Sequence, residues 1–181
     1  MVYTSDNGCG PIADFYELKK KGHNPSYIFR GAKADIYEGG HRIPFIVQWP
    51  DKIRAGIVSH AVICLSDFMA TMADCLGITR KADEGEDSIS NLPLWTESQK
   101  EVRRSYPRPG EETDDAPRFQ LYDLEADIGE TTNVILEYPE VATELKRILI
   151  GYILNGRSTP GPKQKNNGRE IWDAIFWIRE D

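Results

Sequence analysis

Apolar residues are unevenly distributed along the chain, and their spacing predicts a mixed α/β structure. Residues 2–4 are β-prone and lead directly into a polar turn at residues 5–8, which predicts a strand that delivers polar side chains to a loop. Residues 43–49 form a nearly continuous apolar run that ends at Pro50, as expected of a buried strand. Another extended segment is predicted at residues 57–65.

Two longer helices are predicted where apolar residues recur at helical spacing. Ser66 is expected to cap the first helix and Gly77 to end it. Its apolar face is predicted to consist of Phe68, Met69, Met72, Ala73, Cys75 and Leu76. The second helix is expected to span about residues 139–155, with Pro139 in its first turn. Its apolar positions are Val141, Leu145, Ile148, Leu149 and Tyr152.

Polar stretches separate these elements and suggest how the chain is organised. Residues 9–32 are predicted to form a long loop, with one helical turn near residues 14–20. Residues 79–118 are poor in apolar residues, and such a long stretch without strong elements is unusual inside a compact domain. We therefore expect an α/β part over 1–90, a linker over 91–118 and a smaller α+β subdomain over 119–181.

Composition and charge narrow the class of protein. The 181 residues are 40% hydrophobic and 28% charged, which is ordinary for a globular protein. The net charge of −7 argues against nucleic acid as a partner, because phosphate binding needs a basic surface. No apolar stretch has the length of a membrane span, and the N-terminal residues do not have the pattern of a signal peptide. Cys9, Cys64 and Cys75 match no zinc spacing.

Two short motifs offer candidate ligand-binding side chains. Asp6 and Asn7 place a carboxylate beside a carboxamide after a strand, and Ca²⁺ takes about six to eight such oxygen ligands. The alternative is that both residues simply form a turn. Lys33 follows a glycine and could approach an anion with its ammonium group, the alternative being a solvated lysine.

Two further motifs have weaker chemical signals. His23 could donate a hydrogen bond to a substrate or shuttle a proton, although a loop histidine can also be exposed and without function. Gly39 and Gly40 allow a close approach of the backbone in a turn. We interpret the flanking Glu38 and Arg42 as supporting ion-pair partners.

Taken in order along the chain, these motifs resemble the formylglycine-dependent sulfatases, in particular arylsulfatases of the alkaline phosphatase superfamily. The resemblance lies in residues 3–8, 30–33, 37–50, 66–67, 121–127 with Glu130 and Asn133, and 156–161. It implies an incomplete alkaline-phosphatase-like mixed sheet with helices, and it identifies the chain as the C-terminal portion of such an enzyme. It also implies a periplasmic or secreted location.

The resemblance assigns roles to the candidate residues. It implies that Asp6 and Asn7 are calcium ligands and that Lys33 contacts the substrate sulfate. His23 occupies a position where related arylsulfatases carry a Gly-His pair, which implies a role on the substrate side. The expected partner is therefore a sulfate ester or sulfate ion.

The sequence departs from the family at the nucleophile. The family makes its formylglycine from the first residue of a Cys-x-Pro-x-Arg motif, and here Cys9 is followed by Pro11 but by Ala13 instead of arginine. Sulfate-ester cleavage needs a nucleophile, a cation and an acid, so we expect the chain alone to be inactive and to bind calcium weakly. We also expect a homo-oligomer or a missing N-terminal half as partner. The alternatives are a non-catalytic protein for binding or assembly, and a phosphoryl-transfer relative.

Overall fold

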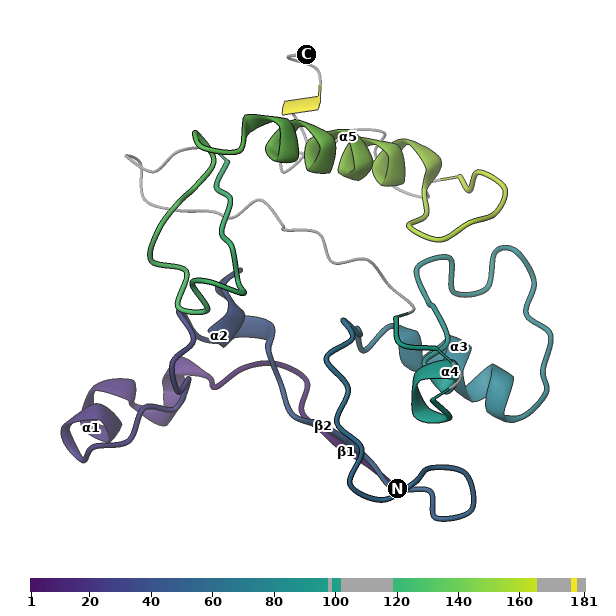
Figure 1. The fold of residues 1–181 in the computed structure, drawn as a ribbon, viewed down its shortest axis with the longest axis horizontal. Helices are drawn as coiled ribbons and strands as arrows, with labels where there is room; N and C mark the ends of the chain where they lie inside the picture. Colours follow the sequence, from purple (N-terminus) through teal and green to yellow (C-terminus); the bar gives the residue numbers. More distant parts are fainter. Residues whose placement is uncertain (98, 102–118, 166–176, 179–181) are drawn as a thin grey trace. The chain divides into compact units, whose positions relative to one another are not determined.

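The computed structural model describes residues 1–97, 99–101, 119–165 and 177–178 (Figure 1). Short helices and strands are joined by long hydrogen-bonded loops. The elements in chain order are β1 (Val2–Thr4), η1 (Pro11–Ala13), α1 (Phe15–Lys20), α2 (Glu38–His41), β2 (Phe45–Val47), α3 (Asp67–Cys75), α4 (Leu92–Trp95) and α5 (Pro139–Asn155). None of the helices in these described ranges is long and apolar enough to cross a bilayer.

Contacts divide the chain into two compact units, each built from two separate stretches of sequence. The first unit comprises Met1–Trp49 and Tyr106–Ala142, and the second comprises Pro50–Ser105 and Thr143–Asp181. The expected division into 1–90, 91–118 and 119–181 stays a prediction, and residues 102–118 of the expected linker lie outside the described residues.

The first unit contains a two-stranded antiparallel sheet. β1 pairs with β2 in the register Val2↔Val47, Tyr3↔Ile46 and Thr4↔Phe45. Tyr3 and Ile46 are exposed while Val2 and Val47 are half-buried, so the side chains alternate between two faces. Both strands are confirmed where the sequence predicts them, although the second is shorter than the apolar run and is not buried as predicted, since Ile46 is 57% exposed. Their pairing brings the polar turn after β1 close to the chain that enters β2.

Residues 57–65, predicted as an extended segment, lie outside the helices and strands of the described residues. Within the described residues the segment pairs with no other strand, and its end is held by a side chain instead. Asp67, which is fully buried, accepts the N–H of Cys64 at 2.8 Å and the N–H of Ile89 at 3.0 Å. The segment therefore leads into the first turn of α3 (Asp67–Cys75) and does not join the sheet.

The first predicted helix is confirmed as α3, but its cap and its buried face differ from the prediction. The hydroxyl of Ser66 donates to the sulfur of Cys64 and caps nothing. The buried residues are Asp67, Ala70, Thr71 and Ala73, whereas Phe68 and Leu76 are 41% and 72% exposed. Small residues on this face let the segment over 88–91 approach, since Ser88 Oγ accepts the N–H of Ala70 at 2.8 Å. Gly77 ends the helix at positive φ, as predicted.

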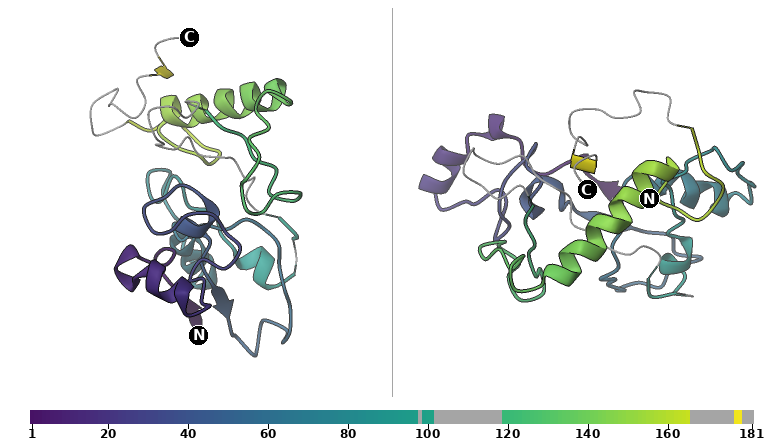
Figure 2. Two further views of the ribbon diagram at one scale, coloured as in Figure 1. Left: turned by 90° about the vertical axis from the view of Figure 1, so that its left-hand side faces the viewer. Right: turned by 90° about the horizontal axis from the view of Figure 1, so that it is seen from above.

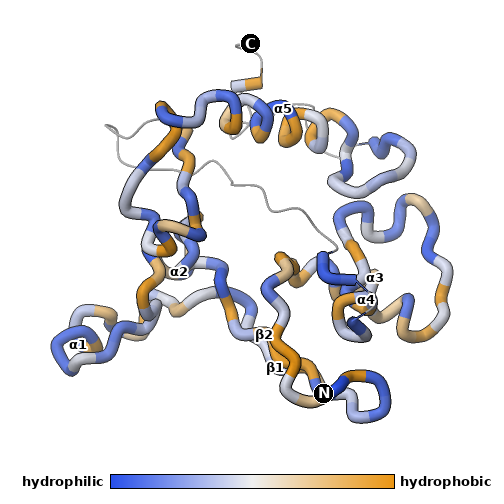
Figure 3. Tube along the Cα trace, viewed as in Figure 1, coloured by the Kyte–Doolittle hydropathy of each residue, from blue (hydrophilic) through white to orange (hydrophobic). Residues whose placement is uncertain are grey.

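The second predicted helix is confirmed as α5, which runs as one straight rod (Figure 2). Apolar and polar positions alternate along it at the predicted spacing (Figure 3). Gly156, at φ +63°, follows its last residue. The short predicted helical turn near residues 14–20 is also confirmed, as α1, with Asp14 accepting the N–H of Glu17 at 3.2 Å.

Candidate functional site

The turn after β1 carries the two predicted metal ligands. Ser5 Oγ donates to the carbonyl of Asn7 at 3.2 Å, which tightens the turn. Asn7 Nδ2 donates to the carbonyl of Gly8 at 2.9 Å, so the side-chain oxygen Oδ1 remains available as a ligand. The carboxylate of Asp6 is exposed and makes no hydrogen bond within the described residues. The turn thus presents two adjacent side chains with available oxygens.

Lys33 lies beside this turn because its backbone is bonded to Cys9, the residue that follows the turn. Its N–H donates to the carbonyl of Cys9 at 2.9 Å. A Cβ added at Gly10 would be 3.7 Å from Lys33 Cδ, so the lysine side chain passes close to the same loop. The structure therefore brings the segment that contains Lys33 against the segment that contains Asp6 and Asn7.

The close approach of these segments to α2 depends on three glycines. The N–H of Gly8 donates to the carbonyl of Gly40 at 2.9 Å. A Cβ at Gly8 would lie 1.9 Å from the oxygen of Gly39, and a Cβ at Gly40 would lie 2.1 Å from the oxygen of Asp35. Gly39 is equally confined, with the oxygen of Gly31 at 2.3 Å from its added Cβ. Backbone packs directly on backbone here, as predicted for Gly39 and Gly40, but in a helical turn and not in a hairpin-like one.

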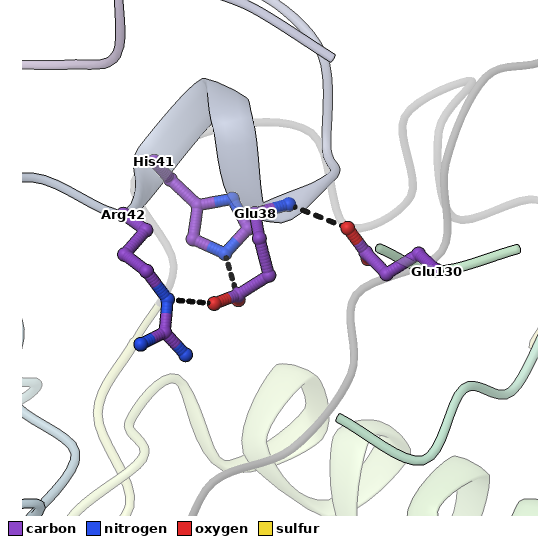
Figure 4. A network of polar contacts seen from close by, with 4 residues as sticks. All are labelled: Glu38, His41, Arg42 and Glu130. Atoms are coloured by element: carbon purple, nitrogen blue, oxygen red, sulfur yellow. Dashed lines mark hydrogen bonds and ion pairs between the residues drawn. The ribbon is translucent and has the colours of Figure 1, made fainter. Parts of the chain in front are cut away.

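Glu38 connects the helical turn α2 to two basic side chains (Figure 4). Its carboxylate forms an ion pair with Arg42 and a hydrogen bond of 3.1 Å with Nε2 of His41. The Glu38 residue is only 8% exposed. The pKa of Glu38 lies below its ordinary value of 4.5, because the bonds from His41 and Arg42 outweigh the opposing effect of burial. The predicted ion pair between Glu38 and Arg42 is confirmed.

Glu130 joins the loop over residues 121–134 to α2 (Figure 4). Its Oε2 accepts the backbone N–H of Glu38 at 2.8 Å, and the residue is 7% exposed. Burial raises the pKa of the Glu130 carboxyl above its ordinary value of 4.5. Arg30 Nη1 donates to the carbonyl of Glu130 at 2.9 Å and to the hydroxyl of Tyr122 at 3.0 Å. The guanidinium of Arg30 also stacks on the ring of Tyr37 at 3.7 Å.

No local sequence pattern predicts that Arg30, Tyr122 and Glu130 support the site. The signal for them in the sequence was their position in the parts that resemble the sulfatases, residues 30–33 and residues 121–127 with Glu130. Nothing in local spacing indicates that these segments pack together, because Glu130 and Glu38 are 92 residues apart.

His23 lies in the exposed loop that follows α1. Its backbone N–H donates to the carbonyl of Leu18 at 2.9 Å, which closes the end of that helix. Within the described part of the chain, no hydrogen bond joins its side chain to Asp6, Asn7 or Lys33. The structure thus links Lys33 with the Asp6–Asn7 turn but gives no contact that adds His23 to them.

The donor set fits part of a calcium site. Calcium prefers carboxylate and amide oxygens, which Asp6 and Asn7 supply in adjacent positions. Among the described residues there is no group of three His, Cys, Asp or Glu side chains able to hold a metal ion. This turn therefore supplies two of the about six to eight oxygen ligands that a calcium ion takes.

A cavity of about 290 Å³ lies in the second unit, between the loop at residues 80–90 and the segment after α5. Arg157 donates through its guanidinium to oxygens of Ala82, Thr159, Pro160 and Pro162. Arg80 donates in the same way to the carbonyls of Glu84, Gly85 and Ser88. Backbone oxygens and the hydroxyl of Thr159 accept these guanidinium N–H groups, so the two arginines hold together the loops that line the cavity.

Comparison with known proteins assigns the family. The family model described as Sulfatase matches residues 1–78. Over an alignment of 181 residues, the chain is 33% identical to an N-acetylgalactosamine-6-O-sulfatase of Bacteroides thetaiotaomicron, which covers 82% of this chain. The chain belongs to the sulfatase family. An arylsulfatase of Hemicentrotus pulcherrimus is 48% identical over 90 residues, or 50% of the chain. The resemblance seen in the sequence is confirmed.

Solved structures support the same family and its fold. A Bacteroides thetaiotaomicron protein from work on glycosaminoglycan metabolism, BT33336S-sulf, aligns with a TM-score of 0.69 at 30% identity over 83% of this chain. Ps i-CgsB, in complex with a neocarrahexaose, aligns with a TM-score of 0.66 at 20% identity over 93% of this chain, and this likeness concerns the fold alone. The predicted α/β, alkaline-phosphatase-like fold of the sulfatases is confirmed.

The chain corresponds to only part of these sulfatases. It spans 35% of the Bacteroides N-acetylgalactosamine-6-O-sulfatase and 15% of the Hemicentrotus arylsulfatase. It spans 38% and 39% of the two solved chains.

Proposed function

We propose that this chain supplies the sulfate-holding lysine and two calcium ligands of a sulfatase. Lys33 contacts a sulfate oxygen, and Asp6 and Asn7 ligate the cation. The observation that carries this proposal is the hydrogen bond of 2.9 Å from the N–H of Lys33 to the carbonyl of Cys9, which holds the lysine beside the ligand turn. Membership of the sulfatase family supports it.

The chemistry of the proposed site is the binding of a charged group. The ammonium group of Lys33 is an exposed point charge on a flexible stem, suited to a tetrahedral anion with several acceptor oxygens. Asp6 and Asn7 are adjacent in one turn, and the N–H of Lys33 donates to Cys9, two residues after Asn7. A calcium ion held there would offset the negative charge of a sulfate oxygen.

His23 is proposed to act on the substrate side, as a hydrogen-bond donor or proton shuttle toward the leaving oxygen. Its position on an exposed loop leaves the imidazole accessible to a ligand. His23→Gln keeps a donor but cannot carry a proton at neutral pH. We expect this change to alter the binding or turnover of a sulfate ester without altering the free energy of unfolding.

The chain by itself is proposed to lack hydrolytic activity. No formylglycine is expected, since Cys9 is followed by Ala13 where the maturation motif needs arginine. A partner that supplies the rest of the site, either a second copy or an N-terminal half, is part of the proposal. It is supported by exposed apolar side chains on and after α3, including Phe68, Met69 and Ile78.

The proposed ligand is a sulfate ester on a sugar, and the proposed location is periplasmic or extracellular. Sulfated saccharides are suggested by relatives named for N-acetylgalactosamine 6-sulfate, from Bacteroides thetaiotaomicron and from Homo sapiens. The names apply to those proteins, and a sulfated amino sugar is the first substrate class to test with this chain.

Titration with sodium sulfate, followed by two-dimensional NMR of the amide groups, tests the proposal. We expect shifts at Lys33, Cys9 and neighbouring amides, and we expect Lys33→Met to abolish them. Lys19→Met is the matched control, because Lys19 is also an exposed lysine of the first unit but lies on α1. Equal sulfate affinity in the two variants would contradict the role of Lys33. Calorimetric titration with CaCl₂ should give weak binding, and sub-micromolar affinity would contradict an incomplete ligand shell.

A second candidate function is the binding of sulfated ligands, or assembly, without catalysis. The absent maturation motif favours it. Incubation of the purified chain with an aryl sulfate separates the two. Sulfate binding without turnover fits both, restored turnover on addition of an N-terminal half supports the first, and turnover by the chain alone would overturn the expected lack of activity.

A further inference from the structure

We propose that Glu130 is a positioning residue for the sulfate and calcium ligands, acting through the helical turn α2. The inference rests on the proposed function of Lys33, Asp6 and Asn7. Glu130 touches none of these residues directly. It holds the backbone to which both of their loops are bonded.

The backbone conformation of Glu130 is the first observation. Its φ is +52°, in the left-handed region that glycine adopts freely and other residues rarely adopt. The preceding residue is a glycine, yet it is the glutamate that takes this conformation. A non-glycine residue is kept there when its surroundings require the side chain. The required side chain is a buried carboxylate.

The hydrogen bond made by that carboxylate is the second observation. Oε2 of Glu130 accepts the N–H of Glu38 at 2.8 Å, and Glu38 is the first residue of α2. This N–H has no partner inside the helix, so the carboxylate satisfies a buried donor. Arg30 Nη1 donates to the carbonyl of Glu130 at 2.9 Å and fixes the same residue from the other side.

A series of backbone hydrogen bonds connects α2 to the proposed ligand loops. The N–H of Gly39 donates to the carbonyl of Arg30 at 2.7 Å, in the segment that leads to Lys33. The carbonyl of Gly40 accepts the N–H of Gly8 at 2.9 Å, in the turn that follows Asp6 and Asn7. A small displacement of α2 would therefore move both loops together.

The contacts around Glu130 indicate which property of its side chain matters. The carboxyl is buried and lies near the charged carboxylate of Glu38, while it accepts a backbone N–H. The function is that of an oxygen acceptor at a defined position, and it does not require a negative charge. Glutamine supplies such an oxygen, whereas glycine fits the backbone conformation but supplies none.

Three variants separate positioning from stability. Glu130→Gln keeps the acceptor, and Glu130→Gly removes it while relieving the left-handed backbone. Asn133→Ala is the matched control, because Asn133 Oδ1 accepts the N–H groups of Leu121 and Ile135 in the same loop but makes no bond to α2. Amide hydrogen exchange at Gly8, Lys33 and Gly39, sulfate affinity by NMR, and urea unfolding are measured for each.

We expect Glu130→Gly to speed exchange at these amides and to weaken sulfate binding, each by about tenfold, as for the loss of one buried hydrogen bond. Glu130→Gln should stay within about twofold of the wild type in both measurements. Asn133→Ala should lower the free energy of unfolding while leaving exchange at Gly8 and Lys33 unchanged.

Two outcomes would overturn the positioning role. One is unchanged exchange at Gly8 and Lys33 in Glu130→Gly, and the other is an equal effect of Asn133→Ala. Failure of the proposed function has a different signature, namely sulfate shifts that survive Lys33→Met or are absent from the wild type. In that case the exchange data still decide whether Glu130 holds the two loops.

Discussion

Gly8 and Gly40 meet backbone to backbone, with the N–H of Gly8 donating to the carbonyl of Gly40 at 2.9 Å. An added Cβ at Gly8 would lie 1.9 Å from the oxygen of Gly39. The contact brings the turn that carries Asp6 and Asn7 onto α2. This contact holds the proposed ligand turn against α2.

Gly40→Ala should therefore destabilise the first unit strongly. Its Cβ would lie 2.1 Å from the oxygen of Asp35, a backbone atom that cannot move without displacing the loop. We expect a loss of about 3 kcal/mol or more in the free energy of unfolding, measured by urea denaturation. Gly151→Ala is the control, since a Cβ there meets nothing within 4 Å and the site is inside α5. It should stabilise by about 0.5–1 kcal/mol.

Tyr37→Phe should leave stability unchanged or raise it by up to about 1 kcal/mol. The hydroxyl of Tyr37 is buried and has no hydrogen-bond partner among the described residues, so its removal relieves an unpaired polar group. Tyr122→Phe removes a hydroxyl that accepts from Arg30 at 3.0 Å and donates to Gln120. Tyr122→Phe should lower the free energy of unfolding by about 1 kcal/mol, and urea unfolding of both variants measures these effects. Equal effects of the two substitutions would contradict this.

Glu38→Gln should lower the free energy of unfolding by about 1–2 kcal/mol at neutral pH. Glutamine keeps one acceptor but loses the charge that His41 and Arg42 share, and both partners are half exposed, so screening limits the loss. Glu144→Gln is the control, because its pair with Arg147 lies on the exposed face of α5. A much smaller effect is expected there. A loss in Glu144→Gln as large as that in Glu38→Gln would refute the special role of the buried carboxylate.

Stability should depend on pH in opposite directions at Glu38 and Glu130. The folded-state pKa of Glu38 is lowered, so its contribution is present above the ordinary value of 4.5 and is lost as the pH falls through the folded pKa. The pKa of Glu130 is raised, so its contribution is present below 4.5 and is lost as the pH rises through the folded pKa.

Urea unfolding of the wild type and both glutamine variants, from about pH 3.5 to 7, separates these effects. Relative to Glu38→Gln, the wild type should gain stability as the pH rises. Relative to Glu130→Gln, it should lose stability over the same range. Parallel curves for all three proteins would show that neither carboxyl is perturbed by folding.

Local patterns were sufficient to locate β1, β2, α1, α3 and α5, but they did not predict the short helices η1, α2 and α4. α5 follows from its apolar spacing and from Pro139 and Gly156 at its ends, because a helix requires only neighbours three and four positions away. The β1 and β2 strands follow from short β-prone runs with clear polar boundaries. The candidate ligands Asp6, Asn7 and Lys33 were found in the same way, with their order along the chain resembling that in the sulfatases.

Long-range packing decided what local pattern could not. The sequence predicts Phe68 and Leu76 as buried on α3, yet Ala70 and Thr71 are buried instead, because the segment that approaches this face comes from residues 88–91. Likewise, Ser66 was expected to cap α3, but Asp67 bonds Cys64 and Ile89 and holds the chain there.

Long-range packing also decided which residues support the proposed site. Residue type and spacing indicate Asp6, Asn7 and Lys33 as candidates, because the binding chemistry of each residue lies in its own side chain. The bond between Glu130 and Glu38 joins residues 92 positions apart, and its strength depends on burial that exists only once the chain is folded. Chemical identity is local, but the loss of water around a carboxylate and the meeting of two backbones are properties of the packed chain.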